Sequence, residues 1–140
     1  FRKFVSPFLR QLVQGQRELG FYVIKHTDGN IMPILSELVE AGPHALHSID
    51  PQAGVDLGQV KQLVGDRVAL IGNVNCGLLT SGSEAEVAAD VRRSLSQGMA
   101  GYGYIFSTSN CIFTGMPLQR YDLMLDIWRR EATYPAEDVS

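Results

Sequence analysis

The sequence lacks long apolar runs, clustered positive charge and the cysteine content of a disulfide scaffold. No run approaches the roughly 20 apolar residues of a membrane-spanning helix, so no membrane association is predicted. The formal net charge is −3 and the basic residues are scattered, which argues against nucleic acid as a partner. The two cysteines, Cys76 and Cys111, do not form a CxxC pair. We therefore expect a reducing, cytoplasmic setting.

Two further features are missing. Neither GxGxxG nor GxxxxGK[ST] occurs, which argues against a nucleotide-binding open sheet. The chain begins at Phe1 without an initiator Met or a signal-peptide pattern, and we interpret it as a piece of a longer protein. The adjacent arginines, Arg92-Arg93 and Arg129-Arg130, are interpreted as solvated helix faces.

What the sequence does contain is a regular alternation of helical and strand-like segments. Helices are predicted over about 4–19, 31–41, 57–64, 84–98 and 117–128, and strands over about 21–24, 45–49, 68–71 and 104–106. Strict alternation of this kind implies right-handed βαβ units and a parallel sheet. We therefore predict one α/β domain over residues 1–140, built from four parallel strands and a preceding helix.

Local signals support these boundaries. Asn30 and Asp56 are placed to cap helices, and Ser83 with Glu86 has the spacing of a capping box. The continuous apolar run at 21–24 is typical of a strand that is covered on both faces.

Each predicted strand ends in polar residues. They are His26, Asp28, Asp50, Asn73, Cys76, Ser107 and Cys111. Because the carboxyl ends of parallel strands meet at one edge of a sheet, these side chains should surround a common site. Periodicity does not separate a small open sheet from half of an eight-stranded barrel, which usually needs about 250 residues.

Several of these residues also have a structural interpretation. A buried Asn73 side chain can join neighbouring loops, and Asp28 can accept amides in a tight turn. Cys76 is more simply a small buried residue. We expect His44 and His47 to be structural and hydrogen-bonded.

Sequence motifs over nearly the whole chain resemble the C-terminal half of the uroporphyrinogen decarboxylase superfamily. They are His26-Thr27-Asp28-Gly29-Asn30, Ile49-Asp50-Pro51-Gln52-Ala53-Gly54, Gly65-Asp66-Arg67-Val68-Ala69-Leu70-Ile71-Gly72-Asn73-Val74, Gly103-Tyr104-Ile105-Phe106-Ser107 and Cys111-Ile112-Phe113-Thr114-Gly115-Met116-Pro117. The resemblance implies the C-terminal half of a (β/α)8 barrel.

One branch of this superfamily consists of corrinoid-linked methyltransferases that bind zinc through a His-x-Cys pair and a distant Cys. The resemblance places His26 at the zinc-branch His, Asp28 at the neighbouring Cys and Cys111 close to the distant Cys. A carboxylate is an accepted zinc ligand, although a harder one for a metal that activates sulfur. The interpretation we favour is therefore zinc-dependent methyl transfer between a corrinoid, delivered by a partner protein, and a thiol.

The other branch decarboxylates uroporphyrinogen without a metal or cofactor. In this alternative Asp50, Asn73 and Ser107 would bind a carboxylated substrate, and no catalytic residue is assigned. The His that this branch carries after its last strand is missing from Ser107-Thr108-Ser109-Asn110-Cys111.

A third interpretation concerns the isolated chain. Four strands alone leave two open sheet edges. We expect such a piece to dimerise, to bind a missing N-terminal half or to be poorly soluble, and to lack activity of its own.

Overall fold

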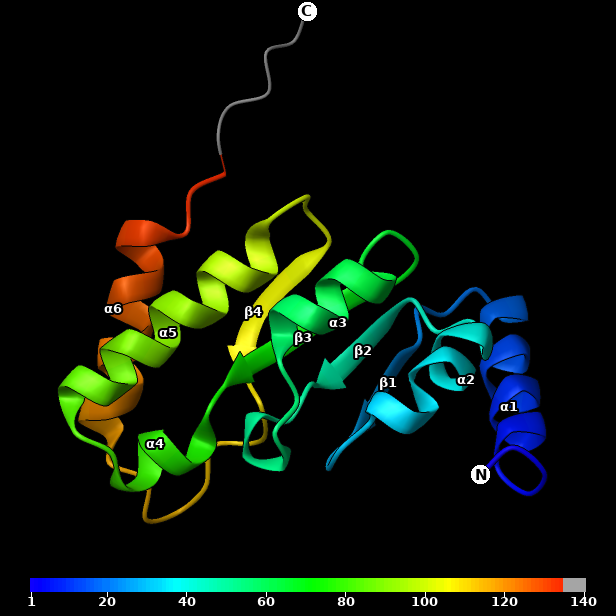
Figure 1. Cartoon of the computed structure of the whole chain (residues 1–140), viewed down its shortest axis with the longest axis horizontal. Helices are drawn as coiled ribbons and strands as arrows, with labels where there is room; N and C mark the ends of the chain where they lie inside the picture. The colour runs from blue at the N-terminus through cyan, green and yellow to red at the C-terminus, as the bar shows by residue number, and fades with distance from the viewer. Residues whose placement is uncertain (135–140) are drawn as a thin grey trace, which may run out of the picture.

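Four strands form one parallel sheet in a computed structural model that describes residues 1–134 (Figure 1). They are β1 (Ile24–Thr27), β2 (Ala45–Ser48), β3 (Ala69–Val74) and β4 (Tyr104–Thr108). Their order in the sheet is the order in the chain, β1-β2-β3-β4. This topology results when each connection crosses over through a helix to the next neighbouring position.

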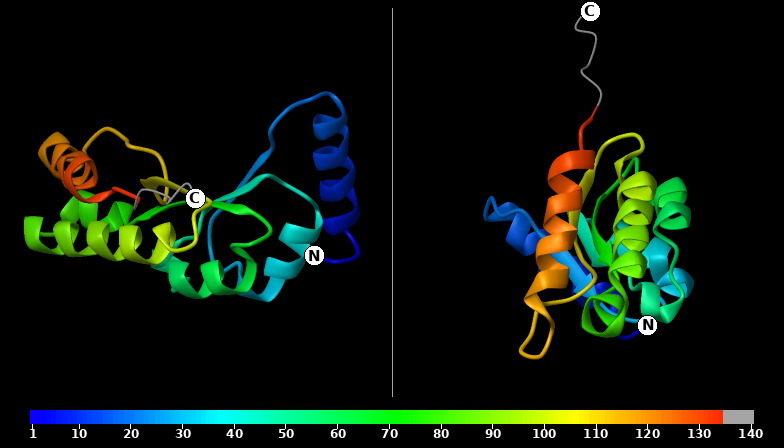
Figure 2. Two further views of the ribbon diagram at one scale, coloured as in Figure 1. Left: turned by 90° about the horizontal axis from the view of Figure 1, so that it is seen from above. Right: turned by 90° about the vertical axis from the view of Figure 1, so that its left-hand side faces the viewer.

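The helices alternate with the strands. They are α1 (Ser6–Glu18), α2 (Leu35–Glu40), α3 (Leu57–Val64), α4 (Cys76–Ser81), α5 (Glu84–Met99) and α6 (Leu118–Glu131). Helices α2, α3 and α5 lie on one side of the sheet, and α1 and α6 lie at its two ends (Figure 2). The predicted alternation is confirmed, and the α/β arrangement with its preceding helix is consistent with part of a (β/α)8 barrel.

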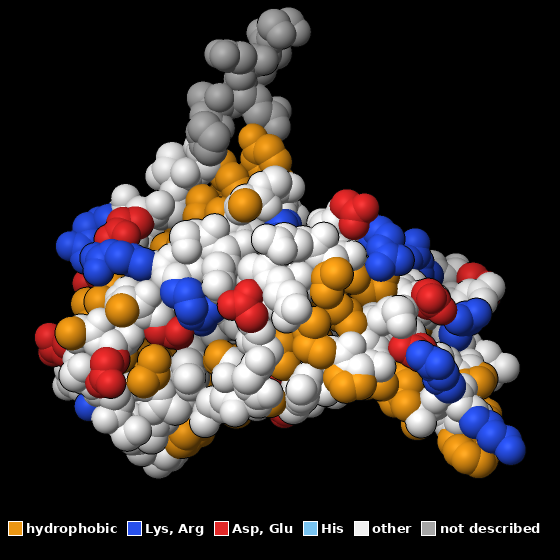
Figure 3. Space-filling model, in the orientation of Figure 1, with side chains coloured by type: hydrophobic (Ala, Val, Ile, Leu, Met, Phe, Trp, Pro, Cys, Tyr) orange, Lys and Arg blue, Asp and Glu red, His pale blue; other side chains and the backbone are white. Residues whose placement is uncertain are grey.

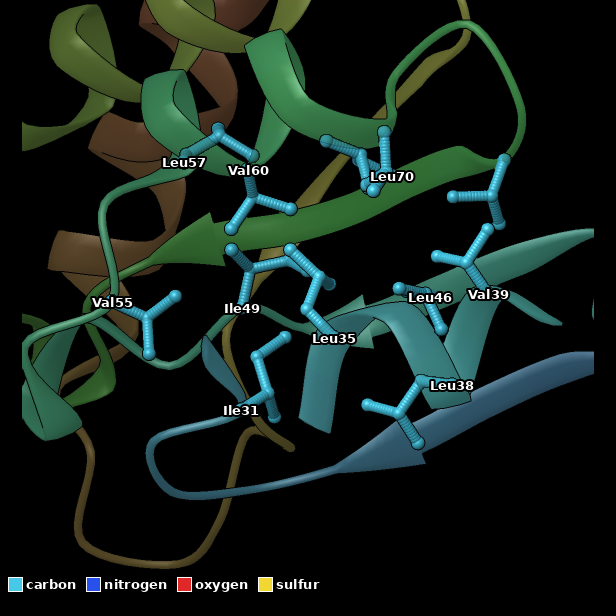
Figure 4. Close-up of a cluster of buried hydrophobic side chains, with 12 residues drawn as sticks. Ile31, Leu35, Leu38, Val39, Leu46, Ile49, Val55, Leu57, Val60 and Leu70 are labelled. Atoms are coloured by element: carbon cyan, nitrogen blue, oxygen red, sulfur yellow. The ribbon is translucent and has the colours of Figure 1, made fainter. Parts of the chain in front are cut away.

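The main core lies between the sheet and the helices α2 and α3 (Figure 4). Leu46 of β2 and Leu70 of β3 share a register position and are almost fully buried. They pack with Leu38 of α2 and Val60 of α3. Because side chains alternate along a strand, the neighbouring positions of β2 and β3 face away from these helices.

Two of the three predicted capping signals are confirmed. Asp56 accepts a hydrogen bond from the Gln59 amide at 2.7 Å. Ser83 and Glu86 form the reciprocal capping box. Asn30 accepts from the Met32 amide at 3.0 Å, but the N-cap position of the following 3-10 turn is Ile31 and that of α2 is Ile34, so the predicted helix cap at Asn30 is not formed. These contacts satisfy backbone amides that have no partner inside their helices.

Three details differ from the sequence predictions. The first strand is Ile24–Thr27 rather than 21–24, and Phe21, Tyr22 and Ile24 are exposed. In the described residues β1 pairs only with β2, so it is an edge strand. None of its residues is buried, so it is not covered on both faces. The helix predicted over 31–41 begins as a 3-10 turn, Met32–Ile34, with Pro33 in its first turn, where a missing amide hydrogen is tolerated. Helix α4 was not predicted.

On the face with helices α3 and α5, acidic and basic side chains are interspersed (Figure 3). None of the helices within residues 1–134 has the length and apolar character that crossing a membrane requires.

Candidate functional site

The strand ends are joined by hydrogen bonds at one edge of the sheet. Asp28, just after β1, accepts from the Ser48 hydroxyl at 2.9 Å and from the Asn110 side-chain amide at 3.2 Å. The Gly29 amide donates to Asp50 Oδ2 at 3.2 Å. The segments after β1, β2 and β4 therefore meet, as predicted from their parallel arrangement.

Two histidines lie side by side next to this edge. His26 of β1 and His47 of β2 occupy the same register position, and their Nδ1 atoms are 2.7 Å apart. Since Leu46 faces the helices, alternation places His47 on the opposite face of the sheet. The other nitrogen of His26, Nε2, lies 3.4 Å from Asp28 Oδ1. A histidine pair and a carboxylate thus share the face that α2, α3 and α5 leave open.

The electrostatics of the cluster follow from these contacts. The Ser48 hydroxyl lowers the pKa of the Asp28 carboxyl below its ordinary value, and His26 and Asn110 act in the same direction. Partial burial lowers the pKa of His47, because it disfavours the charged imidazole. Asp28 is therefore ionised, and His47 neutral, over most of the physiological pH range.

The residues predicted to bind zinc are only partly brought together. His26 and Asp28 are in contact, whereas Cys111 is exposed and its amide donates to the Asn110 side chain. Within residues 1–134, no three His, Cys, Asp or Glu side chains form a group able to hold a metal ion. The described residues alone therefore do not fit the three protein ligands of a zinc site.

The predicted substrate-binding residues occupy three different environments. Asp50 uses both carboxylate oxygens for the Gly29 and Gln52 amides, so it fixes the turn after β2. Asn73 is fully buried. Ser107 lies on β4 beside a small hollow of about 150 Å³ that Trp128 also lines. Of the three, Ser107 borders a cavity, whereas Asp50 and Asn73 are hydrogen-bonded within the protein.

Asn73 is held by helix α5. Its side-chain amide donates to Ile49 O at 2.8 Å, and its Oδ1 accepts from Arg93 Nη1 at 3.1 Å. Arg93 also donates to Asp90 Oδ1 at 2.8 Å, and Asp90 Oδ2 accepts from the Asn75 amide at 2.8 Å. The interpretation of Arg93 as part of a solvated helix face is therefore wrong.

Sequence reasoning also missed two other members of the site. His47 was predicted to be structural and hydrogen-bonded; it is hydrogen-bonded to Thr108 O, but its direct contact with His26 was not foreseen. Asn110 was not singled out, yet it contacts Asp28 across 82 positions of sequence. The available signal was positional, because His47 lies in a predicted strand and Asn110 lies at the end of one.

A parallel sheet alternating with helices, with polar side chains gathered at the carboxyl ends of its strands, defines a βα protein of the barrel type. A family model described as "Uroporphyrinogen decarboxylase (URO-D)" matches residues 1–131, and the chain belongs to this family.

Individual relatives agree with the family assignment. The uroporphyrinogen decarboxylase of Coxiella burnetii (strain Dugway 5J108-111) is 33% identical over 136 residues, which cover 90% of this chain and 35% of the relative. That of Pseudomonas paraeruginosa (strain DSM 24068 / PA7) is 29% identical over 122 residues, or 80% of this chain and 31% of the relative. The chain thus spans about a third of the length of these relatives.

Proposed function

We propose that this chain is part of an enzyme that decarboxylates uroporphyrinogen or a related carboxylated substrate without a metal ion. The observation that carries the proposal is the cluster of His26, His47 and Asp28 at the carboxyl end of the sheet, on the face that α2, α3 and α5 leave open. The names of the relatives support the same reaction class.

The chemistry places a simple demand on such a site. The bond between the carboxylate and its carbon breaks, CO2 leaves, and the carbon that keeps the electron pair takes a proton. An imidazole is well suited to donate that proton near neutral pH. His26 is the proposed donor, because 42% of its side chain is exposed and Asp28 lies beside it.

The test is turnover of uroporphyrinogen by the protein that contains this chain, in the presence of a chelator. Activity that persists with chelator and falls at least about tenfold in His26→Ala would support the proposal. His44→Ala is the matched control, because His44 accepts from the Val23 amide and contacts the exposed Tyr22 ring. Absence of CO2 release, or activity that the chelator abolishes, would refute it.

A second candidate function is zinc-dependent methyl transfer between a corrinoid, carried by a partner protein, and a thiol. The observation that favours it is the contact between His26 and Asp28, with Cys111 next to the Asn110 that binds Asp28. In this candidate His26 and Asp28 would supply two ligands, whereas Cys111, the third predicted ligand, is exposed and does not form a metal-binding group with them in the described residues. Bound zinc would supply activation of the thiol as a thiolate.

Metal analysis of the purified protein tests this candidate. One equivalent of zinc that is lost in His26→Ala, Asp28→Ala and Cys111→Ser, but retained in Cys76→Ser, would support it. Wild-type protein without zinc, and the same metal content in His26→Ala, would refute it.

A further inference from the structure

His47 lies at the centre of the candidate site, and neither reaction proposed above assigns it a role. One of its nitrogens, Nε2, is 3.2 Å from the backbone oxygen of Thr108 at the end of β4. The other, Nδ1, is 2.7 Å from His26 Nδ1 on β1. His47 therefore connects the two outer strands of the sheet through one imidazole ring.

The identity of these partners determines where the protons lie. A carbonyl oxygen has no hydrogen to donate, so His47 Nε2 is the donor to Thr108 O. A neutral imidazole that donates from Nε2 has a lone pair on Nδ1. The Nδ1 atom of His26 must then supply the hydrogen of the contact between the two rings.

The opposite arrangement would place two protons on His47 and an acceptor nitrogen on His26. It is disfavoured because the carboxylate lies beside His26 and not beside His47: Asp28 Oδ1 is 3.4 Å from His26 Nε2. A positive charge on either ring is stabilised most when it is nearest to the carboxylate. With Nδ1–H donating to His47, the contact with Asp28 is favourable when Nε2 also carries a hydrogen, because an ionised carboxylate can only accept.

We infer that His47 is a positioning residue: its Nδ1 accepts a hydrogen bond from His26 Nδ1–H, and this leaves Nε2 as the nitrogen of His26 that faces Asp28. A ring fixed in this way presents one nitrogen in one orientation, as with histidines whose second nitrogen is hydrogen-bonded. The relevance of this fixed orientation to catalysis rests on the proposed function. The inference itself concerns only the ring protons.

Multiple-bond 1H–15N correlation spectra of the 15N-labelled protein, recorded with chelator, test the inference directly. This chain contributes three histidines, His26, His44 and His47, and single substitutions identify the signals of each. We expect a protonated Nδ1 in His26 and a protonated Nε2 in His47. A wild-type spectrum in which His26 carries its proton on Nε2 alone would overturn the inference.

Two variants of His47 sharpen the test. Gln in place of His47 keeps one acceptor and one donor, so His47→Gln should retain the Nδ1 proton on His26. His47→Leu offers neither, and His26 should shift to the Nε2 tautomer that free histidine favours. His44→Gln is the control and should leave the His26 signals unchanged. Identical His26 signals in wild type and folded His47→Leu would contradict the inference.

Circular dichroism establishes whether each variant is folded, and the wild-type spectrum decides the tautomer even if His47→Leu does not fold. Because these spectra do not measure turnover, the inference and the proposed function can fail independently.

Discussion

Replacing Arg93 by methionine removes every hydrogen bond that its guanidinium makes, while it keeps much of the aliphatic side chain. The guanidinium donates to Asn73 Oδ1 at 3.1 Å, to Asn73 O at 3.3 Å and to Gln97 Oε1 at 2.8 Å. It also pairs with Asp90 at 2.8 Å. The substitution therefore isolates the contribution of these polar contacts at the end of β3.

The expected loss follows from burial. Asn73 is 0% exposed, and the Asp90 side chain is 11% exposed, so water replaces the lost donors poorly. A buried acceptor without its partner costs about 1–3 kcal/mol. Asn73 still accepts from the Ser94 hydroxyl and Asp90 from the Asn75 amide. The combined loss for these two residues should therefore lie near the lower end of the sum of two such costs. We expect Arg93→Met to lower the free energy of unfolding by about 2–4 kcal/mol.

The neighbouring residue provides a matched control. Arg92 pairs with Glu131 at 2.9 Å, but the two side chains are 54% and 38% exposed. Water screens such an exposed pair, which therefore contributes little to stability, so Arg92→Met should have little effect on the free energy of unfolding. Urea unfolding followed by circular dichroism measures both variants. In thermal unfolding, about 3–4 °C per kcal/mol is expected for a chain of this size. Equal losses in the two variants would refute the assignment of Arg93 to a buried network.

Three further predictions concern packing, pH and association. A Cβ added at Gly98 would lie 2.5 Å from the Tyr104 ring, whereas one at Gly15 meets nothing within 4 Å. Gly98→Ala should therefore cost about 1–3 kcal/mol and Gly15→Ala gain about 0.5–1 kcal/mol in urea unfolding, and the reverse order would contradict the packing. Because its pKa is lowered in the folded state, ionised Asp28 stabilises the fold above the ordinary carboxyl pKa, and this stabilisation is lost as pH falls through the folded-state pKa. Asp28→Asn should therefore flatten the acid limb of a curve of stability against pH. An unchanged slope would contradict this. The isolated chain should self-associate in light scattering because its sheet edges are open, and a clean monomer with cooperative melting would disprove this.

Local signals predicted the fold well where they involve residues close in sequence. Asp56 and the Ser83–Glu86 box cap their helices as predicted, because a cap depends on residues two or three positions apart. Helix α4 was missed because it has only six residues, too few to show a helical period. Its cap, the Asn75 side chain that accepts from the Gly77 amide at 2.8 Å, could have indicated it.

The candidate site was predicted in position but not in its contacts. Polar residues at strand ends correctly indicated that Asp28 and Asp50 lie at one edge, and they are joined through the Gly29 amide. The partner of His26 was not predicted, because the contact with His47 depends on the register between β1 and β2.

By itself, the sequence determined the alternation of helices and strands, the parallel sheet and the edge at which polar side chains gather. These properties follow from hydrophobic periodicity and chain connectivity, which can be read from residues close together in the sequence. Only the tertiary structure decided that Asn73 is buried beneath α5, that Arg93 holds it, and that His26 faces both His47 and Asp28. Such contacts join distant segments, and their geometry is fixed by strand register and helix packing rather than by any local pattern.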